Sequence, residues 1–407
     1  MNNPRSIRLG KTSLDSSAAT AAASLPPCER GEPGLETIPA FDYRGGLAEQ
    51  RSEILGAIAR VLDSGSLILG PEVAAFESEF ARFVGATHAV GTSSGTDALI
   101  VALRALNVGP GDEVITVANG PVPTVAAIRA VGAMPRFVDV DPASLQMAPD
   151  KIATAINDRT RCVLPMHLYG WPAPLEPIAE LCRDRGLALV EDCAQAHGTW
   201  LGNRHAGTCG DIGCFSFYPT KNLGAFGDAG MCVTADAALA ANIREQTCYG
   251  FQGDRIAHRE GLNCRLDEIQ AACLRVRLKN LPAALQRRQQ IAARYRSGLQ
   301  GSGLRMLPLP EHGIASWHQF VIRVDARDAW IQWLDQHRIQ VGIHYAVPVH
   351  RMPAYDWLGV EEGSLLASEQ ACREVLSLPI YPELSDSQID RILAALRAGL
   401  TARLSCV

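Results

Sequence analysis

Between residues 86 and 235, short apolar runs alternate with amphipathic segments, and this pattern constrains the fold more than any other feature of the sequence. The apolar runs are predicted strands at His88–Gly91, Glu113–Val117, Pro135–Val140, Arg161–Met166, Leu187–Glu191, Cys214–Tyr218 and Met231–Thr234. Helical patterns such as Thr96–Leu106 and Leu175–Arg185 lie between them. The alternation predicts an α/β fold, with a mainly parallel sheet that is flanked by helices.

The remaining segments suggest how the chain is divided. Residues 1–36 are rich in Ser, Ala, Pro and Gly without periodicity, which predicts a disordered N-terminal tail. Helical patterns run over Leu47–Leu62 and over Asp267–Leu299. The last third then reads as strand, helix and strand at Trp317–Val324, Ala329–His337 and Gln340–His344. We therefore predict a large α/β domain over residues 37–280 and a smaller C-terminal α+β domain over residues 281–407.

Composition excludes several classes of function. A net charge of -5 gives no basic footprint for nucleic acid. No apolar run approaches the roughly 20 residues that cross a bilayer, so no membrane association is expected. The N-terminus lacks a continuous apolar leader, which predicts a cytoplasmic protein. The 12 cysteines include no C-x-x-C pair, so no metal site is predicted.

Lysine is scarce, which makes each lysine a candidate for chemistry. Of 38 basic residues only four are lysines, namely Lys11, Lys151, Lys221 and Lys279. An arginine stays protonated in a protein, whereas a lysine amine can become a nucleophile. Lys221 alone follows a predicted strand of the sheet, and open α/β sheets place their ligands at the carboxyl ends of strands. A surface lysine after an edge strand is the simpler alternative.

Two further positions share this edge of the predicted sheet. Asp192 follows the strand Leu187–Glu191, where a buried carboxylate would need a cationic partner. A helix N-cap is an equally good interpretation of Asp192 on spacing alone. The segment Gly91–Thr96 joins a strand to a helix, and its backbone N–H groups could hold a phosphate. An ordinary strand-to-helix turn would have the same residues.

A hydrolase is the main rival at this level, because Gly91–Gly95 also matches the nucleophile-elbow pattern G-x-S-x-G with Ser93 as nucleophile. The match follows the first strand of the alternating region, so no earlier strand could supply an oxyanion loop. The sequence has no Walker A lysine and no G-x-G-x-x-G motif, which disfavours nucleotide hydrolysis and hydride transfer. A phosphate loop, an acid and a lysine at one sheet edge instead match the needs of pyridoxal 5′-phosphate (PLP).

A set of ordered motifs between Ile38 and Arg397 resembles the DegT/DnrJ/EryC1/StrS sugar aminotransferases of PLP fold type I. The motifs are Gly70–Val73, Ser94–Leu99, His167–Gly170, Glu191–Gly198, Phe215–Leu223, Gly227–Gly230, Asn263–Ala272, His344–Tyr345 with His350, and Leu376–Pro382. The resemblance implies that an amino acid, expected to be glutamate, donates its amino group to a nucleotide-linked keto sugar or a cyclitol ketone.

The nearest alternative keeps PLP and performs elimination or cyclisation. A non-catalytic sensor is disfavoured because Lys221 and Asp192 are both present. Some relatives have histidine in place of the lysine and remove a hydroxyl group, and Lys221 argues against that branch as well.

The resemblance also assigns roles to single residues. Lys221 would bind the cofactor covalently and move protons, Asp192 would pair with the pyridine nitrogen, and Gln195 would lie beside the ring hydroxyl. A phosphate cradle would consist of Gly95, Thr96, Asp97 and the Ser216 hydroxyl. Asn263 would reach the phosphate from a second subunit, which implies a homodimer with shared active sites.

The sequence departs from the family at one position. Where the family usually has an aromatic residue stacked on the cofactor, the segment Asn119–Thr124 offers Pro121. His344, Tyr345 and His350 could line the sugar side of the site, although packing and surface roles would suit them equally well.

Overall fold

The computed structural model of the 407-residue chain describes residues 36–42 and 44–404. The predicted N-terminal tail therefore lies outside the described residues, apart from Glu36. Among the helices of the described part, none has the length and apolar character needed to span a bilayer.

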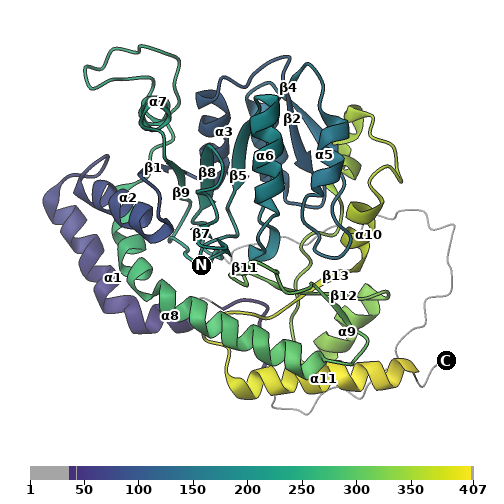
Figure 1. The fold of residues 1–407 in the computed structure, drawn as a ribbon. Coiled ribbons are helices and arrows are strands. Elements are labelled where there is room, and N and C mark those ends of the chain that lie inside the picture. The colour runs from purple at the N-terminus through teal and green to yellow at the C-terminus, as the bar shows by residue number, and fades with distance from the viewer. Residues whose placement is uncertain (1–35, 43, 405–407) are drawn as a thin grey trace.

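The predicted α/β architecture is confirmed by a seven-stranded sheet in the order β1-β9-β8-β5-β4-β2-β3 (Figure 1). Its strands are β1 (His88–Thr92), β2 (Glu113–Val117), β3 (Met134–Val138), β4 (Thr160–Val163), β5 (Ala188–Asp192), β8 (Ile212–Ser216) and β9 (Gly230–Thr234). All pairs from β8 to β3 are parallel, whereas β9 is antiparallel to both of its neighbours. Every strand predicted between residues 86 and 235 is present, with ends that differ by a few residues.

Helices cover both faces of this sheet, and Figure 1 shows several of them against it. The helices of the N-terminal and central parts are α1 (Arg44–Ser64), α2 (Pro71–Val84), α3 (Gly95–Ala105), α4 (Val122–Ala130), α5 (Pro149–Ala155), α6 (Leu175–Arg185) and α7 (Ala237–Thr247). Successive side chains of a strand point to opposite faces of the sheet, so the side chains of β8 pack against helices of both layers. Phe215 packs with α2 on one face, and Cys214 packs with α3 on the other.

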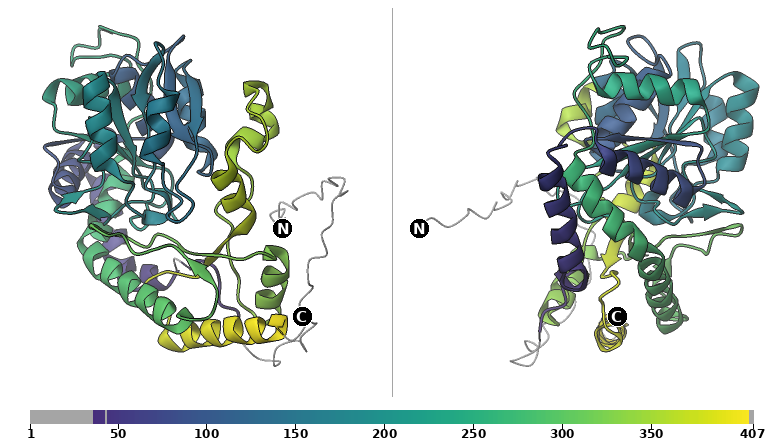
Figure 2. Two further views of the ribbon diagram at one scale, coloured as in Figure 1. Left: turned by 45° about the vertical axis from the view of Figure 1, so that its right-hand side comes forward. Right: turned by 90° about the vertical axis from the view of Figure 1, so that its left-hand side faces the viewer.

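The C-terminal part has its own small sheet, in the order β10-β12-β13. Its strands are β10 (Arg305–Met306), β12 (Phe320–Arg323) and β13 (Val375–Leu378), and its helices are α9 (Arg327–Gln336), α10 (Leu366–Glu374) and α11 (Asp386–Leu404). The short strands β6 (Trp200–Leu201), β7 (Arg204–His205) and β11 (Gly313–Ile314) form a third sheet. The two further views in Figure 2 show α11 and α9 away from the large sheet.

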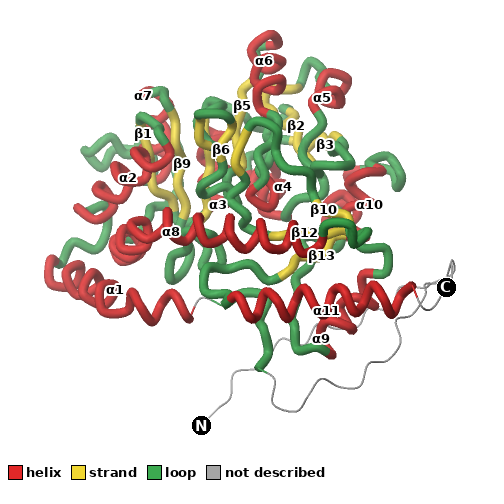
Figure 3. Tube along the Cα trace, turned by 60° about the horizontal axis from the view of Figure 1, so that its bottom comes forward, coloured by secondary structure: helices red, strands yellow, loops and turns green. Residues whose placement is uncertain are grey.

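Helix α8 (Glu268–Leu299) connects the two main parts, and Figure 3 shows it alongside both α1 and α11. One continuous core joins strand residues of the large sheet, such as Ile115 and Val163, to Phe320 and Leu376 of the small sheet. The predicted domain division at residue 280 falls within α8 and stays a prediction.

The predicted strand Gln340–His344 is wrong. This segment makes one isolated bridge, from Gly342 to Ser377, and the preceding residue Ile339 makes another to Ile38. Its apolar residues Val341 and Ile343 are partly buried against the core, and β13 pairs on its other side with β12. The apolar pattern of this segment therefore indicates burial and not a strand.

Candidate active site

Asp192 lies at the carboxyl end of β5 with 3% of its surface exposed. The Thr124 hydroxyl donates a hydrogen bond to its Oδ2 at 2.7 Å, and the Ala194 backbone N–H donates to its Oδ1 at 3.1 Å. No cationic side chain of residues 36–42 and 44–404 forms an ion pair with this carboxylate. A buried carboxylate without a cation is costly, so the site is suited to a ligand that carries a positive charge at this point.

A second strand end brings Ser216 of β8 against the N-terminus of α3. A Cβ atom on Gly95 would lie 2.5 Å from the Ser216 Cβ, so only glycine allows the two backbones to come this close. The Asp97 N–H donates to the Ser94 Oγ at 3.0 Å and is therefore already used as a helix cap. Within the described residues, the N–H groups of Gly95 and Thr96 have no acceptor, and anions favour such a helix start.

Lys221 follows β8 in a turn in which its own N–H donates to the Tyr218 carbonyl at 2.8 Å. Its side chain keeps some exposed surface. Burial lowers the pKa of the Lys221 amine to about 8, and the attraction of Asp192 opposes this shift only in part. A lysine with such a pKa has a substantial neutral fraction near neutral pH, which nucleophilic attack requires.

Gln195 is buried and connects the two parts of the molecule. Its Oε1 accepts a hydrogen bond from the Tyr169 N–H, and its Nε2 donates to the Tyr345 hydroxyl at 3.2 Å. The neighbouring His344 donates or accepts at Ser377 Oγ, 2.9 Å away. Burial, together with the charge of Lys221, lowers the pKa of His344 to about 4, so this imidazole is neutral at physiological pH.

Pro121 is the N-cap of α4, with extended backbone angles of φ -75° and ψ 153°. It follows β2, whose carboxyl end lies on the same sheet edge as that of β5. Gly120 packs so close to Met166 that a Cβ atom there would lie 2.5 Å from the Met166 Cε. The structure thus keeps the Pro121 segment at the edge that holds Asp192.

Two of the predicted residues are not brought into this group. His350 is buried, and its Nε2 lies 3.2 Å from a Glu369 carboxylate oxygen, which is a packing role. Asn263 is exposed, and its backbone pairs with Cys248. Its side chain has no hydrogen-bond partner among the described residues of its own chain.

The sequence analysis missed two residues that organise this edge. Thr124 contacts Asp192 directly, and its position shortly after the strand β2 is the feature of the sequence that could have identified it. Asn222 connects the Lys221 turn to the C-terminal part, because its Nδ2 donates to the Ser316 carbonyl at 3.2 Å and its Oδ1 lies 3.3 Å from the His318 Nδ1. No periodicity of the sequence predicts such a long-range contact.

The buried group of His167, Glu191 and Cys193 has donor atoms close enough for a metal ion, but hydrogen bonds already use His167 and Glu191. His167 Nε2 lies 3.0 Å from Glu191, and three backbone N–H groups donate to the same carboxylate, from Gly207, Cys209 and Gly210. These hydrogen bonds hold the pKa of Glu191 low against the effect of burial. The group serves to fix the loop after β7.

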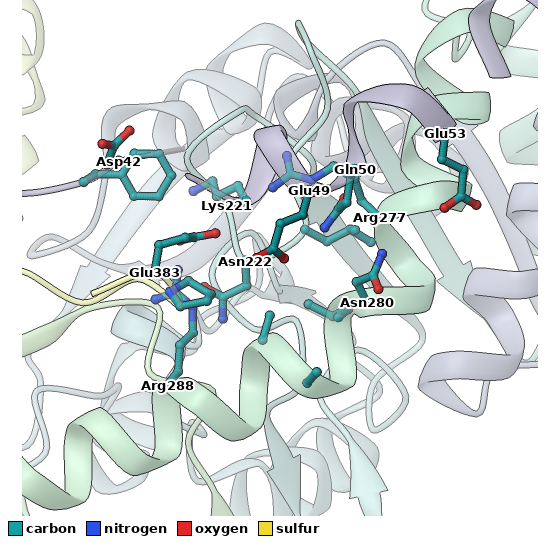
Figure 4. A pocket seen from close by; sticks show the side chains of 17 residues that line it. Asp42, Glu49, Gln50, Glu53, Lys221, Asn222, Arg277, Asn280, Arg288 and Glu383 are labelled. Carbon is teal, nitrogen blue, oxygen red and sulfur yellow. The ribbon is translucent and has the colours of Figure 1, made fainter. Parts of the chain in front are cut away.

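Lys221 also borders a pocket of about 410 Å³, shown in Figure 4. Its wall includes Gln50 of α1, Arg277 and Arg288 of α8, and Glu383. Lys221 therefore belongs both to the group of residues at the sheet edge and to the lining of this pocket.

The model of the DegT/DnrJ/EryC1/StrS aminotransferase family matches residues 48–397. The chain is 44% identical to a dTDP-3-amino-3,4,6-trideoxy-alpha-D-glucose transaminase of Streptomyces venezuelae, over 88% of this chain and 95% of that protein. It is 42% identical to a UDP-N-acetyl-3-dehydro-alpha-D-glucosamine 3-aminotransferase of Acidithiobacillus ferrooxidans, over 89% of this chain and 98% of that protein.

A solved structure is similar as well. The crystal structure of DesV from Streptomyces venezuelae, in complex with a ketimine intermediate, superimposes with a TM-score of 0.88 at 43% identity. The match covers 90% of this chain and 99% of DesV.

Proposed function

The chain belongs to the DegT/DnrJ/EryC1/StrS aminotransferase family, and on that basis we propose that it transfers an amino group from glutamate to carbon 3 of a nucleotide-linked keto sugar. It is a PLP-dependent enzyme that acts on keto sugars. The rival reactions of elimination and cyclisation are not favoured, because both relatives described above are named for amino transfer.

The observation that carries this proposal is the meeting of Lys221, Asp192 and the Gly95–Ser216 contact at one sheet edge. In the proposed roles, Asp192 pairs with the protonated pyridine nitrogen, and Gln195 lies beside the ring hydroxyl. The N–H groups of Gly95 and Thr96, with the Ser216 hydroxyl, hold the phosphate. Asp97 contributes through its carboxylate, which accepts hydrogen bonds from the hydroxyls of Ser93 at 2.6 Å and Ser94 at 2.7 Å and thereby shapes the loop.

Bound in this way, PLP supplies an electron sink for the carbon that loses or gains a proton. Lys221 Nζ takes the proton from the α-carbon of the donor and returns a proton to the sugar carbon in the second half of the reaction. The lowered pKa of Lys221 suits this exchange, because the amine can act as base and as acid near neutral pH.

The position of amination is inferred from the two relatives. One is named for a dTDP-linked sugar and the other for a UDP-linked sugar, but both names place the amine at carbon 3. A dTDP-linked 3-keto hexose is our first choice of acceptor, because the dTDP-sugar enzyme has the higher identity of the two.

We also propose that the enzyme is a homodimer in which Asn263 completes the active site of the partner. Large apolar side chains are exposed on the loop after α1, namely Leu67, Ile68 and Leu69, and Tyr249 is exposed where its backbone N–H donates to the Leu262 carbonyl beside Asn263. A groove of about 1120 Å³ lies between Leu69, Cys248 and Phe251. An exposed patch of this kind marks an interaction site, and Asn263 pairs with Cys248 at its border.

The test of the proposed function is a pair of half-reactions. Purified holoenzyme mixed with glutamate should release 2-oxoglutarate and lose the absorbance of the lysine-bound cofactor. A panel of 3-keto and 4-keto sugars linked to dTDP or UDP should then restore that absorbance, fastest with a dTDP-linked 3-keto sugar. Faster amination of a 4-keto sugar would refute the assignment to carbon 3, and no reaction with any amino donor would refute amino transfer.

A further inference from the structure

The pocket beside Lys221 is built from segments that are far apart in the sequence. Helices α1 and α8 form two of its walls, and the turn at Lys221 and the segment at Pro382–Glu383 form the others. Figure 4 shows side chains from all of these segments gathered around one space. At about 410 Å³ the pocket is large enough for a small amino acid with its solvent.

Ion pairs neutralise only some of the charges that line the pocket. Asp42 pairs with Arg44 at 2.9 Å, and Glu53 pairs with Lys279 at 2.9 Å. Among the described residues, no carboxylate pairs with the two lining arginines, Arg277 and Arg288. The lining acids Glu49 and Glu383 likewise have no ion pair in this part of the chain.

Arg277 is the clearest case of a cation that has no carboxylate partner among the described residues. Its Nη1 donates to the Gly224 carbonyl in the Lys221 turn, and its guanidinium lies 5.8 Å from the ring centre of Phe226. Burial lowers the pKa of Arg277, and Glu383 offsets this only in part. Both of its contacts orient the guanidinium, and neither neutralises its charge.

Arg275 on the same helix shows the usual arrangement by contrast. It lies 2.6 Å from Glu72 and 2.6 Å from Glu79, and these carboxylates raise its pKa. Half-buried cations are ordinarily paired in this way. The lack of a carboxylate at Arg277, two positions further on, therefore points to a ligand that supplies one.

Arg288 provides a second positive charge in the lining of the pocket. It is 3% exposed, and its Nη1 donates to the backbone carbonyls of Trp317 and Ile380, at 3.0 Å each. Carbonyl oxygens orient the group without cancelling its charge. The charge of Glu383 acts on both arginines without contact, so the pocket combines two guanidinium groups that no carboxylate of the described residues contacts with the two acids Glu49 and Glu383.

We propose that this pocket binds the acidic amino donor, with Arg277 pairing to one of its carboxylates. The inference rests on the proposed function and specifies where its donor binds. An amino acid carries both signs of charge, which matches a lining with unpaired arginines and unpaired acids. A sugar diphosphate carries only negative charge and would meet Glu49 and Glu383 unfavourably. Lys221 lies in the wall of this pocket, so a donor bound here is next to the group that must take its proton.

The test compares Arg277→Gln and Arg277→Lys with Arg294→Gln as a matched control, because Arg294 lies on the same helix, pairs with Asp390 at 2.6 Å and does not line the pocket. A charge-assisted hydrogen bond contributes enough that its loss should raise KM for glutamate by about 10- to 100-fold in Arg277→Gln. Arg277→Lys keeps the charge and should lie between this variant and the wild type. KM for the keto sugar should stay within about twofold in both Arg277 variants, and Arg294→Gln should match the wild type in both constants.

A binding measurement separates a role in the pocket from a role in folding. Glutarate, which cannot react, should raise the thermal midpoint of wild-type holoenzyme and of Arg294→Gln but not that of Arg277→Gln. Should the KM of the keto sugar rise while that of glutamate stays unchanged, the pocket would belong to the acceptor and the proposal would be wrong. Unchanged constants for both substrates would also overturn it. Wild-type conversion of glutamate tests the proposed function separately, since it does not depend on where the donor binds.

Discussion

At the scale of single residues, Lys221 owes its properties to its surroundings. The pKa of its amine lies well below that of an exposed lysine, because burial removes hydration from the charged form. The attraction of the Asp192 carboxylate opposes this shift only in part. The nearby imidazole of His344 is neutral at physiological pH, because burial and the charge of Lys221 lower its pKa to about 4. The turn after β8 therefore holds a lysine that can lose its proton without a strong base beside it.

This environment predicts how cofactor capture depends on pH. Only the neutral amine attacks the carbonyl of PLP, so the rate at which apoenzyme captures PLP should rise up to about pH 8 and then level off. An ordinary lysine would continue to gain rate toward pH 10.5. Stopped-flow absorbance across this range measures the profile, and a rate that still climbs above pH 9 would contradict the assignment.

The same shift predicts a stability difference with a defined sign. The folded pKa of Lys221, about 8, lies below the unfolded value of 10.5. The unfolded chain therefore binds more protons between these two values, and apoenzyme stability should rise as the pH increases from 8 to 10.5. Lys221→Met apoenzyme lacks this group and should show a smaller gain over that interval in urea titrations.

Pro121 is the residue where the sequence leaves the family pattern, and its effect should be modest. A proline can place CH groups on the cofactor ring but has no π-system, and a stacked aromatic pair adds about 0.5–1.5 kcal/mol beyond burial. The extended backbone at Pro121 accommodates other residues. Pro121→Tyr should therefore bind PLP up to about tenfold more tightly on dialysis, while it loses turnover of the native acceptor.

Pro121→Ala is the matched control, because it removes the proline ring without adding an aromatic one. It should bind PLP no more tightly than wild type. Equal PLP retention in Pro121→Tyr and Pro121→Ala would show that this position does not contact the cofactor.

At the scale of elements, the site depends on the register between α4 and the end of β5. Thr124, in the first turn of α4, donates to the Asp192 carboxylate at 2.7 Å in a buried position. A hydrogen bond to a charged group is worth about 1.5–3 kcal/mol. The helix therefore fixes the orientation of the carboxylate that we propose to pair with the pyridine nitrogen.

Thr124→Val keeps the shape of the side chain and removes the hydroxyl, so it should weaken PLP binding by about tenfold. Thr124→Ser restores the donor and should recover most of that affinity. Equilibrium dialysis of PLP with both variants measures the difference, and their thermal midpoints monitor packing. Equal affinity in the two variants would mean that Thr124 has only a packing role.

The elements of the large sheet could be predicted from the sequence because strands that are buried on both faces contain closely spaced apolar β-branched residues, such as Val114, Ile115 and Val117. The places of Asp192 and Lys221 followed from the rule that ligands gather at the carboxyl ends of strands. Thr124 and Asn222 could not be predicted in the same way, since their contacts join segments 68 and 94 residues apart. The strand prediction for Gln340–His344 was wrong because a segment that packs against the core without strand pairing has the same apolar pattern as a strand.

At the scale of the whole molecule, one chain leaves an apolar face exposed. Leu67, Ile68 and Leu69 are each about half exposed, and Tyr249 lies in the loop that pairs with the Asn263 segment. Burying such a face in a two-fold dimer would place the same surface of both chains together. Asn263, which has no side-chain partner in the described part of its own chain, would then lie at the junction between subunits.

The proposal of a shared site predicts the activity of mixed dimers. Lys221→Ala removes the amine that we propose to bind the cofactor and should abolish activity, and Asn263→Ala should weaken PLP binding by about tenfold. In a dimer of one chain of each kind, one site has Lys221 from one subunit and Asn263 from the other, and is intact. Its partner site has neither. Co-expression with two different affinity tags isolates this mixed dimer.

The control is a mixed dimer of Lys221→Ala with wild type, which also has one intact site and one dead site. If Asn263 acts across the interface, the two mixed dimers should have equal kcat at low PLP, because each retains one complete site. If Asn263 acts within its own chain, the dimer with Asn263→Ala has only a weakened site and should lose activity at low PLP while the control does not. Separation of the two chains as monomers on the tagged columns would show that no stable dimer forms and would end the proposal.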